Sequence, residues 1–520
     1  MSMRKILALS FTLVSLASSK TINYPNSSAD VILDRALNAM GGEDVIARLD
    51  GVTYHSPNIY RSRSLMQSYN MDRADTAMAI SGAQNVSFSF DSNELTQRID
   101  RILKPSEYWS WGSPRLDEFN HSLVVRGGKN GFACYVRGNN QIWLPADLTS
   151  GYTDLYDPVF DITVIFDTRT HLPHVVRTIE DHMIYGPSTS DLYLSDYKAV
   201  KGIKFPHLVQ TVYNSTAEKL DATLEDYIIE EITVNPKFSR NFFQGLPDGK
   251  GFFPKAAPKK VEGITHARIG EFSLNGLWAG ITKSTADAIK GKRPVPGLPN
   301  VRWIILDPDQ LGVKQFIIEF EDHLIVGDAP PQHTKEVIKW IKKNINKPIT
   351  HLWPTHHHRD HTGGAAEYVK LGAKLIVADV SAKYWSSIPG AELITFNDTH
   401  PYVHSDSKTQ AWFVWEEQAT HSADWTYAFV TEKCPSKRSP VAVLEADIWH
   451  PGMPDGQNDR ELMREWLNQV DKDGLPESAY VLPTHGQVRP FTELIEHTGY
   501  VYAPKKISDW RGGGAMCQKA

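Results

Sequence analysis

Four histidines and one aspartate lie within six consecutive positions of the stretch "THHHRDHTGG", residues 355–364. In an exposed polar loop these imidazoles would have no evident purpose, and in a core each would leave an unpaired ring nitrogen, at a cost of about 2–7 kcal/mol. A metal ion removes that cost, because neutral imidazole is a preferred zinc ligand. The pattern His356-x-His358-x-Asp360-His361 therefore predicts a metal site.

Three later stretches offer further ligands. "QATHSADW" contains His421, and the apolar strand in "VAVLEADIWHPG" ends close to Asp447. The apolar strand in "AYVLPTHG" has His485 at its end. One polar residue at a strand end is more often structural than a ligand. Several such residues in one half of the chain instead favour delivery of ligands to a single edge of a sheet, where two metal ions could share them.

In order and spacing these residues resemble the metal ligands of the metallo-β-lactamase fold superfamily, over about residues 264–503. "IVGDAP" is similar to the first motif of that family, with Asp328 expected to contact a ligand, although Ala329-Pro330 replaces the usual glycine. The resemblance implies an αββα sandwich that binds two Zn²⁺ per chain. It implies one metal held by His356, His358 and His421, a second held by Asp360, His361 and His485, and Asp447 as the bridge between them.

The resemblance also implies a hydrolytic mechanism. A water shared by two zinc ions can fall in pKa from about 15.7 towards about 7, which gives a bridging hydroxide nucleophile at neutral pH. We expect Asp360 to be catalytic through its metal. His450 follows Asp447 by three positions and is expected either to support the ligands or to protonate the leaving group. Asp424 is expected to fix the imidazole of His421, and His357 to face away from the ligands or to line the rim.

Two positions narrow the activity within the superfamily. True β-lactamases generally lack a carboxylate where Asp447 stands, whereas thioesterases, lactonases, phosphodiesterases and sulfatases generally have one. Diiron flavoproteins of this fold have a glutamate where His358 stands, which argues against redox chemistry. A further alternative is a binding protein that has this fold but has lost catalytic activity. The complete set of candidate ligands disfavours it.

Residues near the ligands favour an uncharged substrate. Phosphoryl and sulfuryl groups usually need Arg or Lys donors, and only Arg359 and Arg489 lie near the ligand positions. Three tryptophans are expected to supply apolar surface there, with core packing as the favoured alternative for the last of them: Trp353, Trp425 and Trp449. We therefore predict hydrolysis of a carboxylic ester, lactone or thioester. The alternatives are a phosphodiesterase or sulfatase and, less favoured, a lactam hydrolase or an iron-dependent oxygenase.

The elements that position these residues are expected to differ between the two halves of the chain. The chain has 520 residues, which favours two domains. In the first half, "SADVILDRALNAMGG" predicts a helix and "SLVVRGGKNGFACYVRG" a hairpin, so we expect an antiparallel, half-barrel-like β-rich domain at 28–244. A linker rich in Gly, Pro and Lys follows at 245–263. Strands and helices then alternate through 264–510, before a flexible tail at 511–520, and the predicted class is α+β.

The N-terminus reads as a signal peptide of about residues 1–19. Arg4 and Lys5 precede an apolar run at 6–16, which is too short to span a bilayer, and small residues follow it. We therefore expect a secreted glycoprotein without stable membrane insertion, with an uncleaved N-terminal anchor as the alternative. The three cysteines allow one disulfide or none. Glycosylation sequons begin at Asn26, Asn85, Asn120, Asn214 and Asn397. The net charge of −6 disfavours nucleic acid, so the expected partner is a small-molecule substrate.

Overall fold

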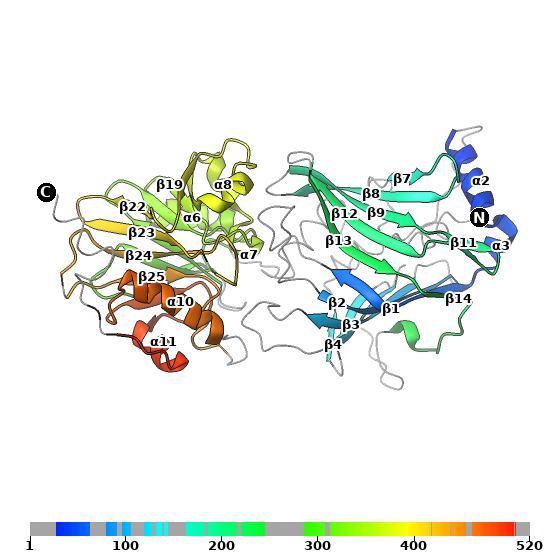
Figure 1. Cartoon of the computed structure of the whole chain (residues 1–520). Helices are drawn as coiled ribbons and strands as arrows, with labels where there is room; N and C mark the ends of the chain where they lie inside the picture. Colours follow the sequence, from blue (N-terminus) through cyan, green and yellow to red (C-terminus); the bar gives the residue numbers. More distant parts are fainter. Residues whose placement is uncertain are drawn as a thin grey trace.

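The computed structural model places most of the chain in two bodies (Figure 1). The described residues are 28–62, 80–90, 96–105, 119–126, 132–137, 140–143, 163–182, 186–215, 220–244, 285–306, 313–417, 419–436, 438–453, 460–503 and 505. The predicted signal peptide, linker and tail lie outside these residues. No helix among the described residues is long and apolar enough to cross a membrane.

The N-terminal body is a curved antiparallel sheet with two helices at one end. Helix α2 spans Ser28–Met40 and α3 spans Glu43–Ala47, with Gly41 and Gly42 at positive φ between them. Met40, Ile46 and Phe205 share a buried core with the sheet. Figure 1 shows that the sheet bends between β2–β4 and β7–β9, and that α2 and α3 lie at the end of the sheet farther from the C-terminal body. The predicted helix and the β-rich character of the N-terminal region are thus confirmed.

The twelve strands of this sheet follow the order β6-β5-β4-β3-β2-β1-β13-β12-β9-β8-β7, with β14 also paired to β1. The predicted hairpin is present as β4 and β5. The strands are β1 Gly51–Ser62, β2 Ile80–Ser89, β3 Thr96–Pro105, β4 Phe119–Arg126, β5 Phe132–Arg137, β6 Asn140–Trp143, β7 Thr163–Phe166, β8 Pro173–His182, β9 Gly186–Ser195, β12 Leu208–Ser215, β13 Leu220–Ile228 and β14 Glu231–Val234. A separate hairpin pairs β10 Lys198–Val200 with β11 Ile203–Phe205.

The C-terminal body contains two mixed sheets. The first has seven strands in chain order: β15 Lys290–Lys292, β16 Val301–Ile305, β17 Lys314–Glu319, β18 Leu324–Gly327, β19 Ile349–Trp353, β20 Lys374–Ala378 and β21 Leu393–Phe396. The second has six: β22 Tyr402–Ser405, β23 Thr409–Trp415, β24 Thr426–Glu432, β25 Ala442–Glu445, β26 Tyr480–Pro483 and β27 Arg489–Pro490. The main helices are α6 Thr334–Asn344, α7 Arg359–Thr362, α8 Ala365–Lys370, α9 Ala382–Trp385, α10 Arg460–Asp473 and α11 Phe491–Thr498.

Alternation along single strands shows how the layers pack. In β17, Phe316 and Ile318 face Phe413 of the other sheet, whereas Ile317 lies in the core with Val337 of α6. Helices α10 and α11 cover the second sheet through a third core. Full burial of one such side chain contributes about 1.5–3 kcal/mol, so three apolar cores hold the four layers together. The predicted αββα sandwich is confirmed.

A contact between described residues joins the two bodies. Tyr213 of β12 is buried in the same cluster as Ile304 and Leu306 of the C-terminal body. The two bodies therefore share a small part of their cores, although the predicted domain boundary lies between them in sequence.

Candidate metal centre

The strand order brings the predicted ligands to one edge of the sandwich. Strand β18 runs parallel to β19, and β25 runs parallel to β26. Parallel strands end at the same edge of a sheet, so the residues after them gather there. Asp328 follows β18, His356 follows β19, Asp447 follows β25 and His485 follows β26. Helix α7 carries Asp360 and His361 beside them.

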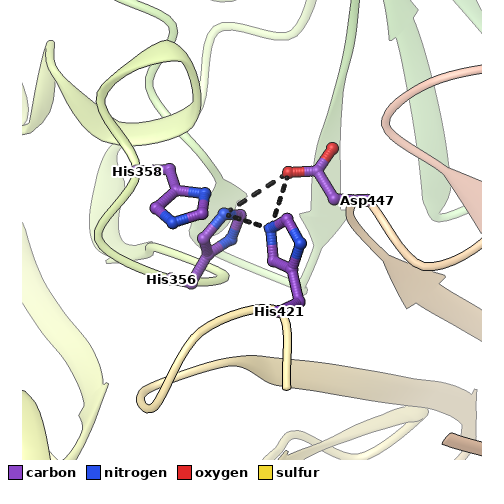
Figure 2. A group of neighbouring side chains, drawn as sticks. All are labelled: His356, His358, His421 and Asp447. Atoms are coloured by element: carbon purple, nitrogen blue, oxygen red, sulfur yellow. Dashed lines mark hydrogen bonds and ion pairs between the residues drawn. The ribbon is translucent and has the colours of Figure 1, made fainter. Parts of the chain in front are cut away.

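The structure places all seven predicted ligands in two adjacent groups. Within each group, one ligand atom from every residue lies within 4.8 Å of the others. The first group is His356, His358, His421 and Asp447 (Figure 2). The second is Asp360, His361 and His485. These groups coincide with the two ligand sets that the resemblance implied.

Asp447 stands between the two groups. Its Oδ2 lies 2.8 Å from Nε2 of His361, 3.3 Å from Nε2 of His421 and 3.4 Å from Nε2 of His356. Its Oδ1 lies 3.2 Å from Nε2 of His485. Burial alone would raise the pKa of Asp447, but the facing imidazoles, His361 above all, hold that pKa well below its usual range. The carboxylate is therefore ionised and contacts both groups.

The chemistry of these residues fits bound metal ions. Nε2 of His358 is buried without a hydrogen-bond partner among the described residues, and a metal would satisfy it. Burial lowers the pKa of His356 to about 4, so this imidazole is neutral and able to coordinate. Burial also acts to lower the pKa of His361, but the carboxylates of Asp447 and Asp360 outweigh it and raise that pKa. The site therefore attracts positive charge. Five imidazoles and two carboxylates are a donor set that suits zinc.

Asp328 orients one of the ligands, as expected. Its Oδ2 accepts a hydrogen bond from Nδ1 of His361 over 3.1 Å, and its Oδ1 accepts one from the backbone N–H of Thr355 over 2.8 Å. The first bond directs Nε2 of His361 towards Asp447. Asp328 adopts φ 61°, a left-handed conformation that non-glycine residues rarely adopt.

Glu445 is a supporting residue that the sequence analysis missed. Its buried Oε2 accepts hydrogen bonds from the backbone N–H groups of Ile448 at 3.1 Å and Trp449 at 3.5 Å. These bonds close the turn that holds Asp447 at φ 68°. Burial is the main reason why the pKa of Glu445 is raised well above its usual range. A carboxylate at the end of an apolar strand, two positions before a ligand, was the available signal.

The expected apolar wall of three tryptophans is wrong. Trp353, Trp425 and Trp449 are all buried in the cores. Trp353 donates its Nε1–H to Oγ1 of Thr426, and Trp425 donates to the carbonyl of Ala446, so both support the ligand loops from inside. The residues beside these tryptophans in the chain are polar as well as apolar, so the sequence pattern does not show whether each ring faces a core or a pocket.

Asp424 and His357 also differ from expectation. Asp424 was expected to fix the ligand His421, but its Oδ1 accepts from Nδ1 of His357 at 2.7 Å. His357 was expected at the rim or facing away, and it is buried. Ser422 supports the same pair, since its hydroxyl donates to Oδ1 of Asp424 over 2.6 Å.

The remaining candidates occupy different surroundings. His450 is buried, with Nε2 3.9 Å from Oδ1 of Asp447 and its ring 5.7 Å from that of His485. Burial lowers its pKa, so its imidazole is neutral near pH 7. Arg489 donates to Oε1 of Gln487 over 2.8 Å. The side chain of Arg359 lies outside the described residues.

Comparisons with known proteins bear on the C-terminal body. No family model and no curated protein matches the chain. Among solved structures, the chain is similar over about two fifths of its length to proteins of the metallo-β-lactamase fold. A metallo-β-lactamase from Pontibacter korlensis is 15% identical over 41% of this chain and 97% of its own, with a TM-score of 0.31. One from Hirschia baltica is 18% identical over 42% of this chain and 99% of its own, with a TM-score of 0.30.

A mutant flavo di-iron protein from Thermotoga maritima is also similar. It is 13% identical over 40% of this chain and 60% of its own, with a TM-score of 0.32. At such low scores the assignment of the fold rests on the strand order and the packing of the layers. The activity has to be argued from the site itself.

Proposed function

We propose that the chain is a secreted, zinc-dependent hydrolase of a carboxylic ester, lactone or thioester. The observation that carries this proposal is the position of Asp447, an ionised carboxylate with one oxygen facing His356, His361 and His421 and the other facing His485. A carboxylate between two imidazole groups is suited to hold two metal ions close together. Two bound zinc ions would supply an activated water as nucleophile and Lewis acidity towards the substrate.

The protein's own residues keep this arrangement in place. Asp328 fixes the orientation of the His361 ring, and Glu445 fixes the turn that presents Asp447. His450 faces the Oδ1 edge of Asp447 from inside the body, where its neutral imidazole can hold a proton near the reacting groups. Buried hydrogen-bonded supports of this kind reduce the reorganisation that a reaction requires.

The type of bond follows from the charges near the site. A substrate that keeps a negative charge usually needs Arg or Lys donors. Arg489 is already engaged with Gln487, and its guanidinium lies 3.8 Å from the Glu493 carboxylate. This favours an uncharged ester over a phosphodiester or a sulfate. With the tryptophans buried, the preference rests on charge alone.

A substrate panel tests the proposed reaction. Purified full-length protein loaded with zinc is assayed against lactones, thioesters, aryl esters, lactams, phosphodiesters and alkyl sulfates. We expect the highest kcat/KM for a carboxylic ester, lactone or thioester, and an Asp447→Ala variant purified in parallel controls for contaminating esterases. A kcat/KM for a phosphodiester or sulfate far above every carboxylic ester would overturn the choice of bond.

Metal content and export are tested separately. Elemental analysis of protein purified without added metal should find zinc, and iron as the main metal would favour the oxygenase alternative. Secretion is supported by the charged and apolar pattern before Ala17 and by a disulfide at Cys434, since disulfides persist mainly in oxidising compartments. Sequencing of exported protein should find a mature N-terminus close to residue 20, and retention of Met1 in soluble intracellular protein would contradict export.

A further inference from the structure

Three histidines from different elements meet away from the candidate metal centre. His323 lies in the turn between β17 and β18, His351 lies in β19, and His404 lies in β22. One ring nitrogen from each lies within 4.8 Å of the other two. We call these residues the distal histidine cluster. His351 is the third of the five residues of β19, whereas the ligand His356 follows three positions after the end of that strand.

Each imidazole of the cluster has an oxygen partner at Nδ1. A carboxylate oxygen of Asp322 lies 2.6 Å from Nδ1 of His323. The hydroxyl oxygen of the neighbouring Thr350 lies 2.8 Å from Nδ1 of His351, and that of Tyr402 lies 2.9 Å from Nδ1 of His404. Oxygen partners of this kind fix ring orientation and tautomer in metal-binding histidines. In the tautomer whose Nδ1–H donates to these oxygens, Nε2 is left as the coordinating atom.

Two of the ring nitrogens that face the centre of the cluster are so close together that a proton or a cation must lie between them. Nε2 of His323 and Nε2 of His404 are 2.7 Å apart. Two bare lone pairs at this distance repel, so they must share either a proton or a cation. Tetrahedral zinc with Zn–N bonds of about 2.0–2.1 Å separates its nitrogens by about 3.3 Å. A small outward rotation of one ring is enough to reach that separation.

The surroundings favour neutral rings. The ring of Phe320 stacks on His323 at 5.0 Å and meets His404 edge-on at 4.7 Å. Burial is the main cause that lowers the pKa of both His351 and His404 to about 4. An imidazolium in the cluster is therefore disfavoured near pH 7. Two neutral arrangements are compatible with the short distance between His323 and His404: an N–H···N hydrogen bond or a shared metal ion, since neutral imidazole is the form that binds transition metals.

We propose that the distal histidine cluster binds one transition-metal ion, zinc by its donor chemistry, in a three-histidine site separate from the hydrolytic centre. His351 belongs to the first sheet and His404 to the second, so the ion ties the two sheets together at this place. His323 links the turn between β17 and β18 to the same ion. The side chain of His323 is 17% exposed, which leaves room for a water as fourth ligand. The expected effect is on stability.

The test compares the zinc content per chain of variants with that of the wild type. The outcome therefore does not depend on the number of ions in the hydrolytic centre. Wild-type protein, His404→Phe and His400→Phe are stripped with chelator, dialysed against excess Zn²⁺, and analysed for zinc per chain. Phe suits the aromatic surroundings of position 404, and His400 is an exposed histidine just before β22 that serves as the matched control. We expect His404→Phe to hold one zinc fewer than both other proteins.

Thermal unfolding gives a second readout. Zinc should raise the Tm of His404→Phe less than that of the wild type or of His400→Phe, with hydrolytic activity retained. His351→Gln should reproduce the loss of one equivalent if the Phe variant folds poorly. Equal zinc content in the wild type, His404→Phe and His351→Gln would show that the cluster is only a hydrogen-bonded contact and would overturn the proposal.

Discussion

Replacement of Asp328 by Asn tests whether this residue positions the ligand His361 or only contributes to folding. The change keeps the shape of the side chain and an acceptor for the N–H of Thr355, but removes the charge that faces Nδ1 of His361. A hydrogen bond to a charged partner contributes about 1.5–3 kcal/mol. At about 1.4 kcal/mol for each factor of ten, we expect zinc affinity at the second ligand group to fall by about 10–100-fold.

The assay is competition for zinc between the protein and a chelator of known affinity, with kcat/KM on the best ester measured in parallel. The matched control is Asp424→Asn, because Asp424 is an equally buried carboxylate on a histidine that is outside both ligand groups. It should change zinc affinity by less than about threefold. Unchanged zinc binding in Asp328→Asn, or an equal loss in Asp424→Asn, would refute the positioning role.

Three further predictions follow from single features of the structure. Asp447→Ala should lower turnover by several orders of magnitude, whereas His450→Ala should lower it by about 10–100-fold, and near-wild-type kcat in Asp447→Ala would mean that another residue is the bridge. A chain starting at Glu262 should keep its metals but unfold at a lower temperature, since Tyr213 is lost from the shared core; elemental analysis and a thermal scan check both. Burial, and then the nearby Glu465, raises the pKa of Glu416 to about 8, compared with about 4.3 in an unfolded chain. The folded state therefore binds more protons between these two values, and stability falls as the pH rises through that window. The Glu416→Gln variant should lose this pH dependence, which amounts to a few kcal/mol at most. Urea unfolding of the wild type and the variant at pH 5.5 and 8.5 measures the effect. An equal loss of stability in the two proteins would contradict the prediction.

The candidate ligands could be found in the sequence because their signals are local, whereas their division between two metals came from the family resemblance. Histidines at alternate positions and a carboxylate just beyond an apolar strand follow directly from how β-strands deliver residues to a sheet edge. The alternation of strands and helices predicted a mixed C-terminal body, whereas its αββα layers were implied by the family resemblance. The contact between Asp328 and His361 came only through the family resemblance, because 33 positions separate the two residues.

Side-chain direction inside buried segments could not be predicted. Trp353 and Trp425 have polar and apolar residues on either side in the chain, so the sequence does not distinguish core from pocket. The partner of Asp424 was wrong for a related reason, because its side chain reaches 67 positions back to His357 rather than to its neighbour. The distal histidine cluster left no sequence signal either, since His323 and His404 are 81 positions apart and meet only when both sheets pack.

The central claim is that Asp447 joins two metal ions at one edge of the sandwich. Crystals of the zinc-loaded full chain, measured at the zinc absorption edge, test this most directly through the positions of the anomalous scatterers. We predict two peaks about 3.5–4 Å apart, one beside His356, His358 and His421 and the other beside Asp360, His361 and His485, with the Asp447 carboxylate between them. A single peak at this edge, or two peaks with Asp447 turned away from both, would contradict the account.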